Sequence, residues 1–149
     1  TLNNFNKSCN VDVFFALSHG VHRGKLKSGK VDDRITFLNK LQSITGNTKF
    51  DIYGINKIQP IWADHYFKTI ENAKMGLNLS RGKAIKYYSS DRITQIVGNG
   101  LVCLIDEKTE YRNFFNDNEM IFYKNVNDLS EKILRLCNDD KKRRFIEVD

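Results

Sequence analysis

Proline and cysteine are scarce in this chain, and it has no long apolar run. Its three cysteines, Cys9, Cys103 and Cys137, are an odd number at wide spacings, which excludes a disulfide framework and a zinc motif. Cys103 and Cys137 lie in apolar patterns, so we expect small buried side chains and a reducing compartment. No stretch approaches the roughly 20 apolar residues that cross a bilayer. The first residues lack the pattern of a signal peptide.

The bulk composition is that of a soluble globular domain. The chain has 149 residues, 40% of them hydrophobic and 28% charged, which is enough to bury one core without covalent staples. We therefore expect a single domain spanning residues 1–149. Because it begins with Thr1 and not Met, we expect it to be a piece of a longer polypeptide. The net charge of +6 favours a polyanionic partner: nucleic acid, anionic lipid or a phosphorylated small ligand.

Short apolar runs alternate with amphipathic segments along the chain. Strands are predicted at residues 10–17, 49–53, 75–79, 101–105 and 119–123. Helices are predicted from Val31, from Asp64 as a cap, from Ser89 or Ser90 as a cap, briefly from Thr109, and from an Asp128/Glu131 capping box. This alternation predicts an α/β fold with a mostly parallel, Rossmann-like sheet and helices on both faces.

Two basic loops follow predicted strands, at the sheet edge where open parallel sheets bind ligands. The first, residues 18–30, has three glycines, four basic residues and no acid. Ser18, His19, Gly20 and Arg23 could form a phosphate cradle beside a helix N-terminus. A solvated loop explains the same residues, and since neither known glycine-rich phosphate motif is present, the pattern does not separate the two readings.

The second basic cluster spans a loop and the start of the next helix, with Arg81, Lys83, Lys86 and Arg92. Arg92 falls in the first helical turn, where the helix dipole opposes a cation that lacks an anionic partner. Asp91 could be that partner, and so could a bound diphosphate. Gln95 lies on the same face at i, i+3, and its amide suits sugar hydroxyls.

Other conspicuous residues favour structural roles. The ten phenylalanines mostly sit at core spacings and not in an exposed stacking ladder, which argues against nucleic acid. The charged stretch 139–144 is typical of a solvated helix surface. His19, His22 and His65 have no spacing that indicates a metal site, so no metal is expected.

The segment from Lys68 to Ile146 resembles the donor-binding C-terminal domain of GT-B glycosyltransferases, and is most similar to the CgeB-type group. The residues that carry the resemblance are Leu77-Asn78, the loop from Ser80, Arg92 with Gln95, Gly100 before Leu101, Glu119, Tyr123, Asp128-Leu129 and Lys132-Ile133. About half of the chain resembles the family closely. A looser likeness extends to the first strand and the Ile52-Tyr53-Gly54 turn.

The resemblance implies the C-terminal half of a GT-B fold that binds a nucleoside diphosphate sugar, without a cofactor or metal. Arg92 would contact the diphosphate, Gln95 the ribose, and Gly54 the base pocket. The full set of expected substrate-binding residues is His19, Gly20, Arg23, Gly54, Arg81, Ser90, Arg92 and Gln95. The family commonly has a carboxylate where Gln95 stands, so a weaker ribose contact is expected.

The sugar acceptor would bind a separate N-terminal domain that these residues do not include. That domain would normally supply the catalytic base, so we expect this chain alone to be inactive. We expect a cytoplasmic location, and the net positive charge is compatible with peripheral contact at the inner face of the membrane. The alternative is a basic α/β module that binds nucleic acid or a phosphate ligand without catalysis. A receiver- or flavodoxin-like domain is disfavoured because these loops are basic.

Overall fold

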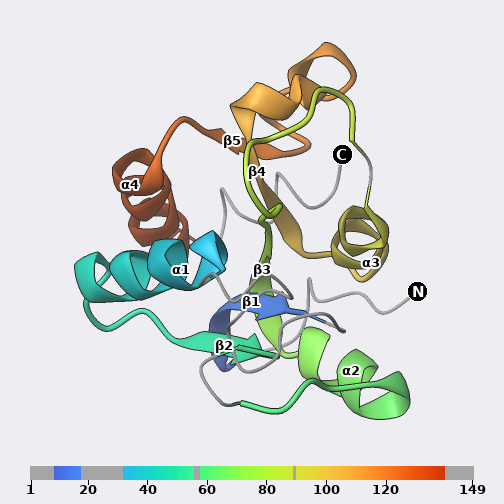
Figure 1. The fold of residues 1–149 in the computed structure, drawn as a ribbon. Coiled ribbons are helices and arrows are strands. Elements are labelled where there is room, and N and C mark those ends of the chain that lie inside the picture. The colour runs from blue at the N-terminus through green and yellow to red at the C-terminus, as the bar shows by residue number, and fades with distance from the viewer. Residues whose placement is uncertain (1–8, 18–31, 56–57, 89, 140–149) are drawn as a thin grey trace.

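The computed structural model describes residues 9–17, 32–55, 58–88 and 90–139, which form a five-stranded parallel sheet with helices on both sides (Figure 1). The strands are β1 (Val11–Ala16), β2 (Phe50–Tyr53), β3 (Ala73–Asn78), β4 (Val102–Asp106) and β5 (Ile121–Tyr123). The helices are α1 (Asp33–Ile44), α2 (Ala63–Ile70), α3 (Asp91–Gly98) and α4 (Val126–Cys137), with short 3-10 turns η2 (Glu107–Thr109) and η3 (Tyr111–Asn113).

The strand order is β2-β1-β3-β4-β5, and every neighbouring pair is parallel. The chain leaves β1 toward β2 and then returns to the other side of β1 to form β3. This reversal is the topological switch point of a doubly wound sheet, and a crevice opens beyond the carboxyl ends of the two strands there. Figure 1 shows α1 and α4 on one side of the sheet and α2 and α3 on the other. The predicted Rossmann-like α/β fold is confirmed.

Both faces of the sheet are buried, which explains why the strands read as almost continuous apolar runs. In β1, Val13 and Phe15 pack toward the side of α1 and α4, whereas Phe14 packs toward α2 and α3. In β4, Leu104 packs toward α1 and α4, and Cys103 packs toward α2 and α3. The alternation gives two apolar cores, one on each side of the sheet.

Helix α3 lies very close to β3 because β3 has a glycine at the contact. A Cβ atom on Gly76 would come within 2.5 Å of Ile96 on α3. Real Cβ atoms do not approach other atoms so closely, so a side chain at Gly76 would push α3 outward. The position of α3 matters because this helix carries Arg92 and Gln95.

Two of the predicted helix starts differ from the structure. Asp64 does not cap α2: the N-cap position is Trp62, and Asp64 lies in the first turn. The capping box of α4 was also placed wrongly, since the Asn125 side chain accepts from the Asp128 backbone N–H. The Asp128 carboxylate accepts from the Lys124 N–H, so Asp128 is the third helical residue and the N-cap lies three residues earlier than predicted.

The short helix expected from Thr109 is two separate 3-10 turns. Glu110 lies between them with a φ of 57°, a left-handed conformation that ends η2. Thr109 belongs to the first turn, and its hydroxyl donates to the Asp106 carbonyl. The i, i+3 spacing of apolar residues in this segment fits a 3-10 turn as well as an α-helix, which is why periodicity did not separate them.

Cys103 is fully buried, as predicted, and burial raises the pKa of its thiol to about 12. Cys137 is half-buried and packs against the core on the α1–α4 side. Within the described ranges, none of the helices is long and apolar enough to cross a membrane.

Candidate functional site

A cavity of about 450 Å³ lies at the carboxyl end of β1, between α2 and α3. We call it the α2–α3 cavity. It is lined by Ala16, Leu17, Ile61, Trp62, Ala63, Tyr66, Phe67, Tyr88, Ser90, Asp91, Arg92 and Gln95. Its place next to the β1/β3 switch point is where doubly wound sheets bind their ligands. Three of the predicted site residues, Ser90, Arg92 and Gln95, therefore share one cavity.

Arg92 brings a positive charge into this cavity without a negative one beside it. Its Nη1 donates to the Leu79 carbonyl at 3.0 Å, and its guanidinium lies 5.0 Å from the centroid of the Phe15 ring. Among the described residues, no carboxylate lies within ion-pair distance of it. Asp91, which the sequence offered as a partner, is not paired with it. Burial and then repulsion by Arg34 lower the pKa of Arg92, and Tyr66 and Tyr88 partly offset this.

Gln95 is held in one orientation by a neighbouring helix. The hydroxyl of Tyr66 on α2 donates to Gln95 Oε1 at 2.6 Å. Since this bond engages the oxygen of the amide, the Nε2 hydrogens are left to donate to a ligand. Burial raises the pKa of Tyr66, opposed by Arg92, so the hydroxyl remains a donor at neutral pH.

Ser90 occupies the N-cap position of α3, yet its side chain makes no capping bond. Its hydroxyl donates instead to Asn78 Oδ1 at the end of β3, at 3.1 Å. The backbone N–H groups of Asp91 and Arg92 donate to no atom in the described part of the chain. These groups carry the positive end of the helix dipole, and both residues are among those that line the α2–α3 cavity.

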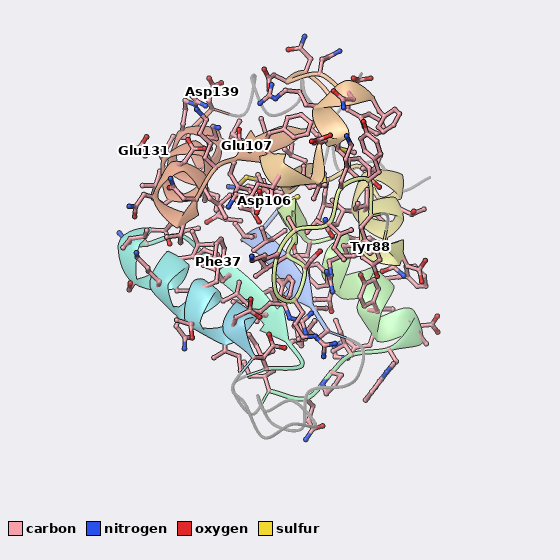
Figure 2. All side chains as sticks on the ribbon, turned by 45° about the horizontal axis from the view of Figure 1, so that its top comes forward. Phe37, Tyr88, Asp106, Glu107, Glu131 and Asp139 are labelled. Atoms are coloured by element: carbon pink, nitrogen blue, oxygen red, sulfur yellow. The ribbon has the colours of Figure 1, made fainter. Side chains whose placement is uncertain are left out.

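Aromatic side chains surround the polar groups. Trp62 is 59% exposed, Tyr88 51% and Phe67 47%, and all three line the α2–α3 cavity. Figure 2 shows Tyr88 on the side of the molecule where α3 lies. The sequence analysis missed these residues and Tyr66. The only signal was an aromatic cluster at the start of α2, which suits a core helix equally well.

The other predicted site residues lie outside this cavity. Gly54 follows β2 with a φ of 84°, and a Cβ atom there would lie 2.5 Å from the Leu17 carbonyl oxygen. It therefore packs against a residue of the cavity wall without lining the cavity. Arg81 is exposed and is not among the described residues that line the α2–α3 cavity. His19, Gly20 and Arg23 lie outside the described residues.

The described residues contain no group of three or more His, Cys, Asp or Glu side chains arranged to hold a metal ion. The residues that line the α2–α3 cavity offer several donors: the Arg92 guanidinium, the Gln95 amide nitrogen and the backbone N–H groups at the start of α3. Its only acidic lining residue is Asp91, which is exposed. Water screens an exposed carboxylate, so its repulsion of an anionic ligand is weak.

A sequence profile of the family described as glycosyl transferase-like matches residues 34–147. The match covers most of the chain, from the start of α1 past the end of α4. It includes every residue that lines the α2–α3 cavity except Ala16 and Leu17. A search of the curated proteins found no match.

Proposed function

The chain belongs to the glycosyl transferase-like family, and we propose that its α2–α3 cavity binds the nucleoside diphosphate part of a sugar donor. In this proposal the domain is the donor-binding C-terminal half of a GT-B enzyme, similar to the CgeB-type group. A separate domain binds the acceptor. The reaction transfers the sugar from the nucleoside diphosphate to that acceptor.

The observation that carries the proposal is that the Arg92 guanidinium forms no ion pair within the described part of the chain. A buried cation is destabilising unless an anion or several hydrogen bonds compensate for it. Among the described residues, Arg92 donates one hydrogen bond, to the Leu79 carbonyl, and its guanidinium lies over the Phe15 ring. A diphosphate supplies the missing negative charge and matches the flat guanidinium with two parallel hydrogen bonds.

The neighbouring donors support the same ligand. Gln95 presents its amide nitrogen because Tyr66 engages its oxygen. The N–H groups of Asp91 and Arg92 at the start of α3 add the partial positive charge of the helix terminus. A ligand rich in acceptor oxygens, such as a diphosphate joined to a ribose, satisfies these donors together.

The size and walls of the cavity also fit a nucleotide. A volume of about 450 Å³ falls in the range of roughly 300–1,000 Å³ that small-molecule sites occupy. The exposed rings of Trp62 and Tyr88 provide flat surfaces on which a base can stack, a contact worth about 1–3 kcal/mol. We place the base against these rings and the diphosphate at Arg92.

Arg92 and the start of α3 would stabilise the diphosphate as it leaves the sugar. Preorganised donors are most effective where negative charge develops in the transition state. The proposal therefore requires no metal ion from this domain. The acceptor and the catalytic base belong to the separate domain, so the chain alone binds the donor without transferring the sugar.

Isothermal titration calorimetry with UDP, GDP, ADP and dTDP tests this assignment. We expect the protein to bind at least one of them, and Arg92→Ala to weaken that binding by about 10- to 100-fold, the value of a charge-assisted hydrogen bond. Arg135→Ala is the matched control, because Arg135 is exposed on α4, on the other side of the sheet. It should bind as the unmodified protein does.

Two results would contradict the proposal. One is that none of the four nucleotides binds. The other is that Arg92→Ala and Arg135→Ala bind equally well. Retention of oligonucleotides with a steep salt dependence and no dependence on Arg92 would favour the nucleic-acid module instead.

A further inference from the structure

A second, smaller cavity lies on the other side of the sheet, where α1 begins and β3, β4 and β5 end. Its volume is about 130 Å³. We call it the α1 cavity, and the lining residues that define its chemistry are Asp33, Phe37, Asn78, Gly82, Asp106 and Tyr123. In Figure 2, Phe37 lies on α1 and Asp106 at the end of β4. Neither the sequence analysis nor the proposed function uses this cavity.

Tyr123 is the unusual residue of the α1 cavity. It is only 1% exposed, and its hydroxyl has no hydrogen-bond partner among the described residues. A buried polar group without a partner costs about 1–3 kcal/mol. Burial, followed by the charges of Asp106 and Cys103, raises the pKa of Tyr123 well above its usual range. The hydroxyl is therefore a protonated donor that lacks an acceptor.

The other polar groups of the cavity are mainly acceptors. The Asp33 carboxylate accepts from the Gly82 N–H at 3.0 Å, and Asp106 Oδ1 accepts from the Lys108 N–H at 2.9 Å. A carboxylate has about four lone-pair sites, so each can accept further bonds. A ligand that fits must accept from Tyr123 and donate to a carboxylate, as a hydroxyl group does.

The charges of the described residues that line the α1 cavity disfavour an anionic ligand. Among these residues Arg34 is the only basic one, and Asp32 neutralises it. Arg34 Nη2 lies 2.7 Å from Asp32 Oδ2, and Arg34 Nε donates to Oδ1 at 3.0 Å. The charges of Asp33 and Asp106 are left to repel phosphate. The Phe37 and Tyr123 rings, with centroids 6.0 Å apart, add an apolar wall suited to C–H groups.

We propose that the α1 cavity binds hydroxyl groups of a carbohydrate, with Tyr123 donating to one sugar oxygen and Asp33 or Asp106 accepting from a sugar hydroxyl. The volume equals about four water molecules at roughly 30 Å³ each, so the cavity holds one edge of a sugar ring. This proposal does not rest on the nucleotide assignment, because it uses different residues on the other side of the sheet.

The two cavities adjoin at the end of β3. Asn78 and Leu79 line the α1 cavity, and from the other side Ser90 donates to Asn78 Oδ1 and Arg92 to the Leu79 carbonyl. The hydroxyl groups could therefore belong to a free saccharide or to a sugar attached to a nucleotide in the α2–α3 cavity. Both sources offer the same chemistry to Tyr123, and titration separates them.

The test is a titration followed by 15N–1H NMR, with the backbone amides of Asp33, Gly82 and Thr109 as reporters. The ligands are D-glucose, D-galactose, D-mannose and glycerol, each alone and with a mixture of UDP, GDP and ADP. We expect at least one saccharide to shift these amides saturably. Tyr123→Phe should weaken that binding by about 3- to 10-fold, the value of one hydrogen bond. Tyr87→Phe, at an exposed hydroxyl outside both cavities, should not change it.

The two sources predict different titrations. Shifts with a saccharide alone indicate a free carbohydrate as the ligand, and shifts only in the presence of nucleotides indicate a sugar delivered with the nucleotide. Arg92→Ala should weaken nucleotide binding by about 10- to 100-fold and leave shifts by a saccharide alone intact, so the two proposals fail separately.

The proposal is overturned if no saccharide shifts the reporter amides under either condition, because the cavity then holds only water. It is also overturned if Tyr123→Phe binds saccharide as tightly as the unmodified protein. Should Tyr123→Phe not fold, Asp33→Asn carries the test. It keeps an oxygen for the Gly82 N–H but removes the charge, and we expect about 3-fold weaker saccharide binding.

Discussion

The α2–α3 cavity and the α1 cavity share the end of β3 but have opposite electrostatic character. In the α2–α3 cavity the cation, Arg92, has no carboxylate beside it in the described structure, and neighbouring residues offer further donors. In the α1 cavity the cation, Arg34, is paired with Asp32, and the remaining groups are mainly acceptors. The comparison teaches that the pairing of each arginine, and not the net charge of +6, decides which ligand each side accepts.

The difference arises from local helix geometry. Asp32 is the N-cap of α1, and its carboxylate accepts from both the backbone and the side chain of Arg34. Asp91 is the first residue of α3, directly before Arg92, and adjacent helical residues point in different directions. An acid two residues before an arginine at a helix start thus neutralises it, whereas an acid directly before the arginine does not.

A glycine with positive φ lies beside each cavity, and a side chain at these two positions should change the stability of the protein by very different amounts. Gly54→Ala should lower the free energy of unfolding by about 2–4 kcal/mol, because the new methyl group meets the Leu17 carbonyl as well as being strained. Gly82→Ala should cost only about 1 kcal/mol, because nothing lies within 4 Å of its Cβ position. Urea denaturation of the two variants measures both values, and equal losses would contradict the contact with Leu17.

A second variant tests whether the α2–α3 cavity prefers anionic ligands because of the shape of the Arg92 guanidinium or because of its charge alone. Arg92→Lys keeps the charge but loses the planar guanidinium that lies over Phe15 and forms paired bonds to phosphate. We expect about 10-fold weaker nucleoside diphosphate binding by calorimetry, equivalent to about 1.4 kcal/mol. Arg81→Lys, on the exposed loop, should leave the affinity unchanged. Full affinity in Arg92→Lys would show that charge alone is enough.

A smaller effect concerns the amide beside Arg92. Tyr66→Phe removes the hydrogen bond that holds Gln95 Oε1, so the amide can rotate and its donors lose their fixed direction. We expect about 3-fold weaker nucleoside diphosphate binding, within the range of one hydrogen bond of about 0.5–1.5 kcal/mol. Saccharide binding at Tyr123 should be unaffected. A loss of saccharide binding in this variant would mean that the cavities are not independent.

The last and weakest effect is the contribution of the Asp32–Arg34 pair to the loss of stability at low pH. Burial alone would raise the pKa of Asp32, but hydrogen bonds from the side chain and backbone of Arg34 outweigh it and hold the pKa below its ordinary value. A carboxyl group with a lowered folded-state pKa stabilises the protein above its unfolded-state pKa and loses that contribution as pH falls through the folded-state value.

We therefore expect the stability of the protein to fall as pH is lowered from 5 to 3, and Asp32→Asn to reduce that dependence. The reduction is partial, because Asp12 and Asp128 also have lowered pKa values. Thermal unfolding across this pH range measures it. Asp117→Asn, in an exposed pair with Arg112, should leave the dependence as it is. An unchanged pH profile in Asp32→Asn would contradict a stabilising Asp32–Arg34 pair.

The sequence was sufficient for the fold class and for part of the site. Alternating strands and helices predicted the sheet, and the i, i+3 spacing of Arg92 and Gln95 placed both on one face of α3. These are local relations that periodicity reports directly. The Tyr66–Gln95 bond joins residues 29 positions apart on different helices, and no local pattern contains that information.

The missed details have the same cause. The sequence analysis made no functional prediction for Trp62 at the start of α2, and Tyr123 at the end of β5 entered only through the family resemblance. Exposure and the lack of a hydrogen-bond partner arise only when distant segments meet. Asp64 satisfied the composition rule for a cap, but the N-cap of α2 lies two residues earlier, at Trp62. The position of a cap depends on the backbone conformation before the helix, and the sequence around Pro60 does not predict that conformation.

Because the strands are parallel, they all end at one edge of the sheet and begin at the opposite edge. Both cavities open where strands end, whereas the turn at residues 46–48 leads into the start of β2 at the opposite edge. Gly46 and Asn47 are exposed in this turn, and nothing lies near the Cβ position of Gly46. A fluorophore or surface tether attached at Asn47 would therefore hold the domain on a sensor with its ligand-accepting edge facing the solution.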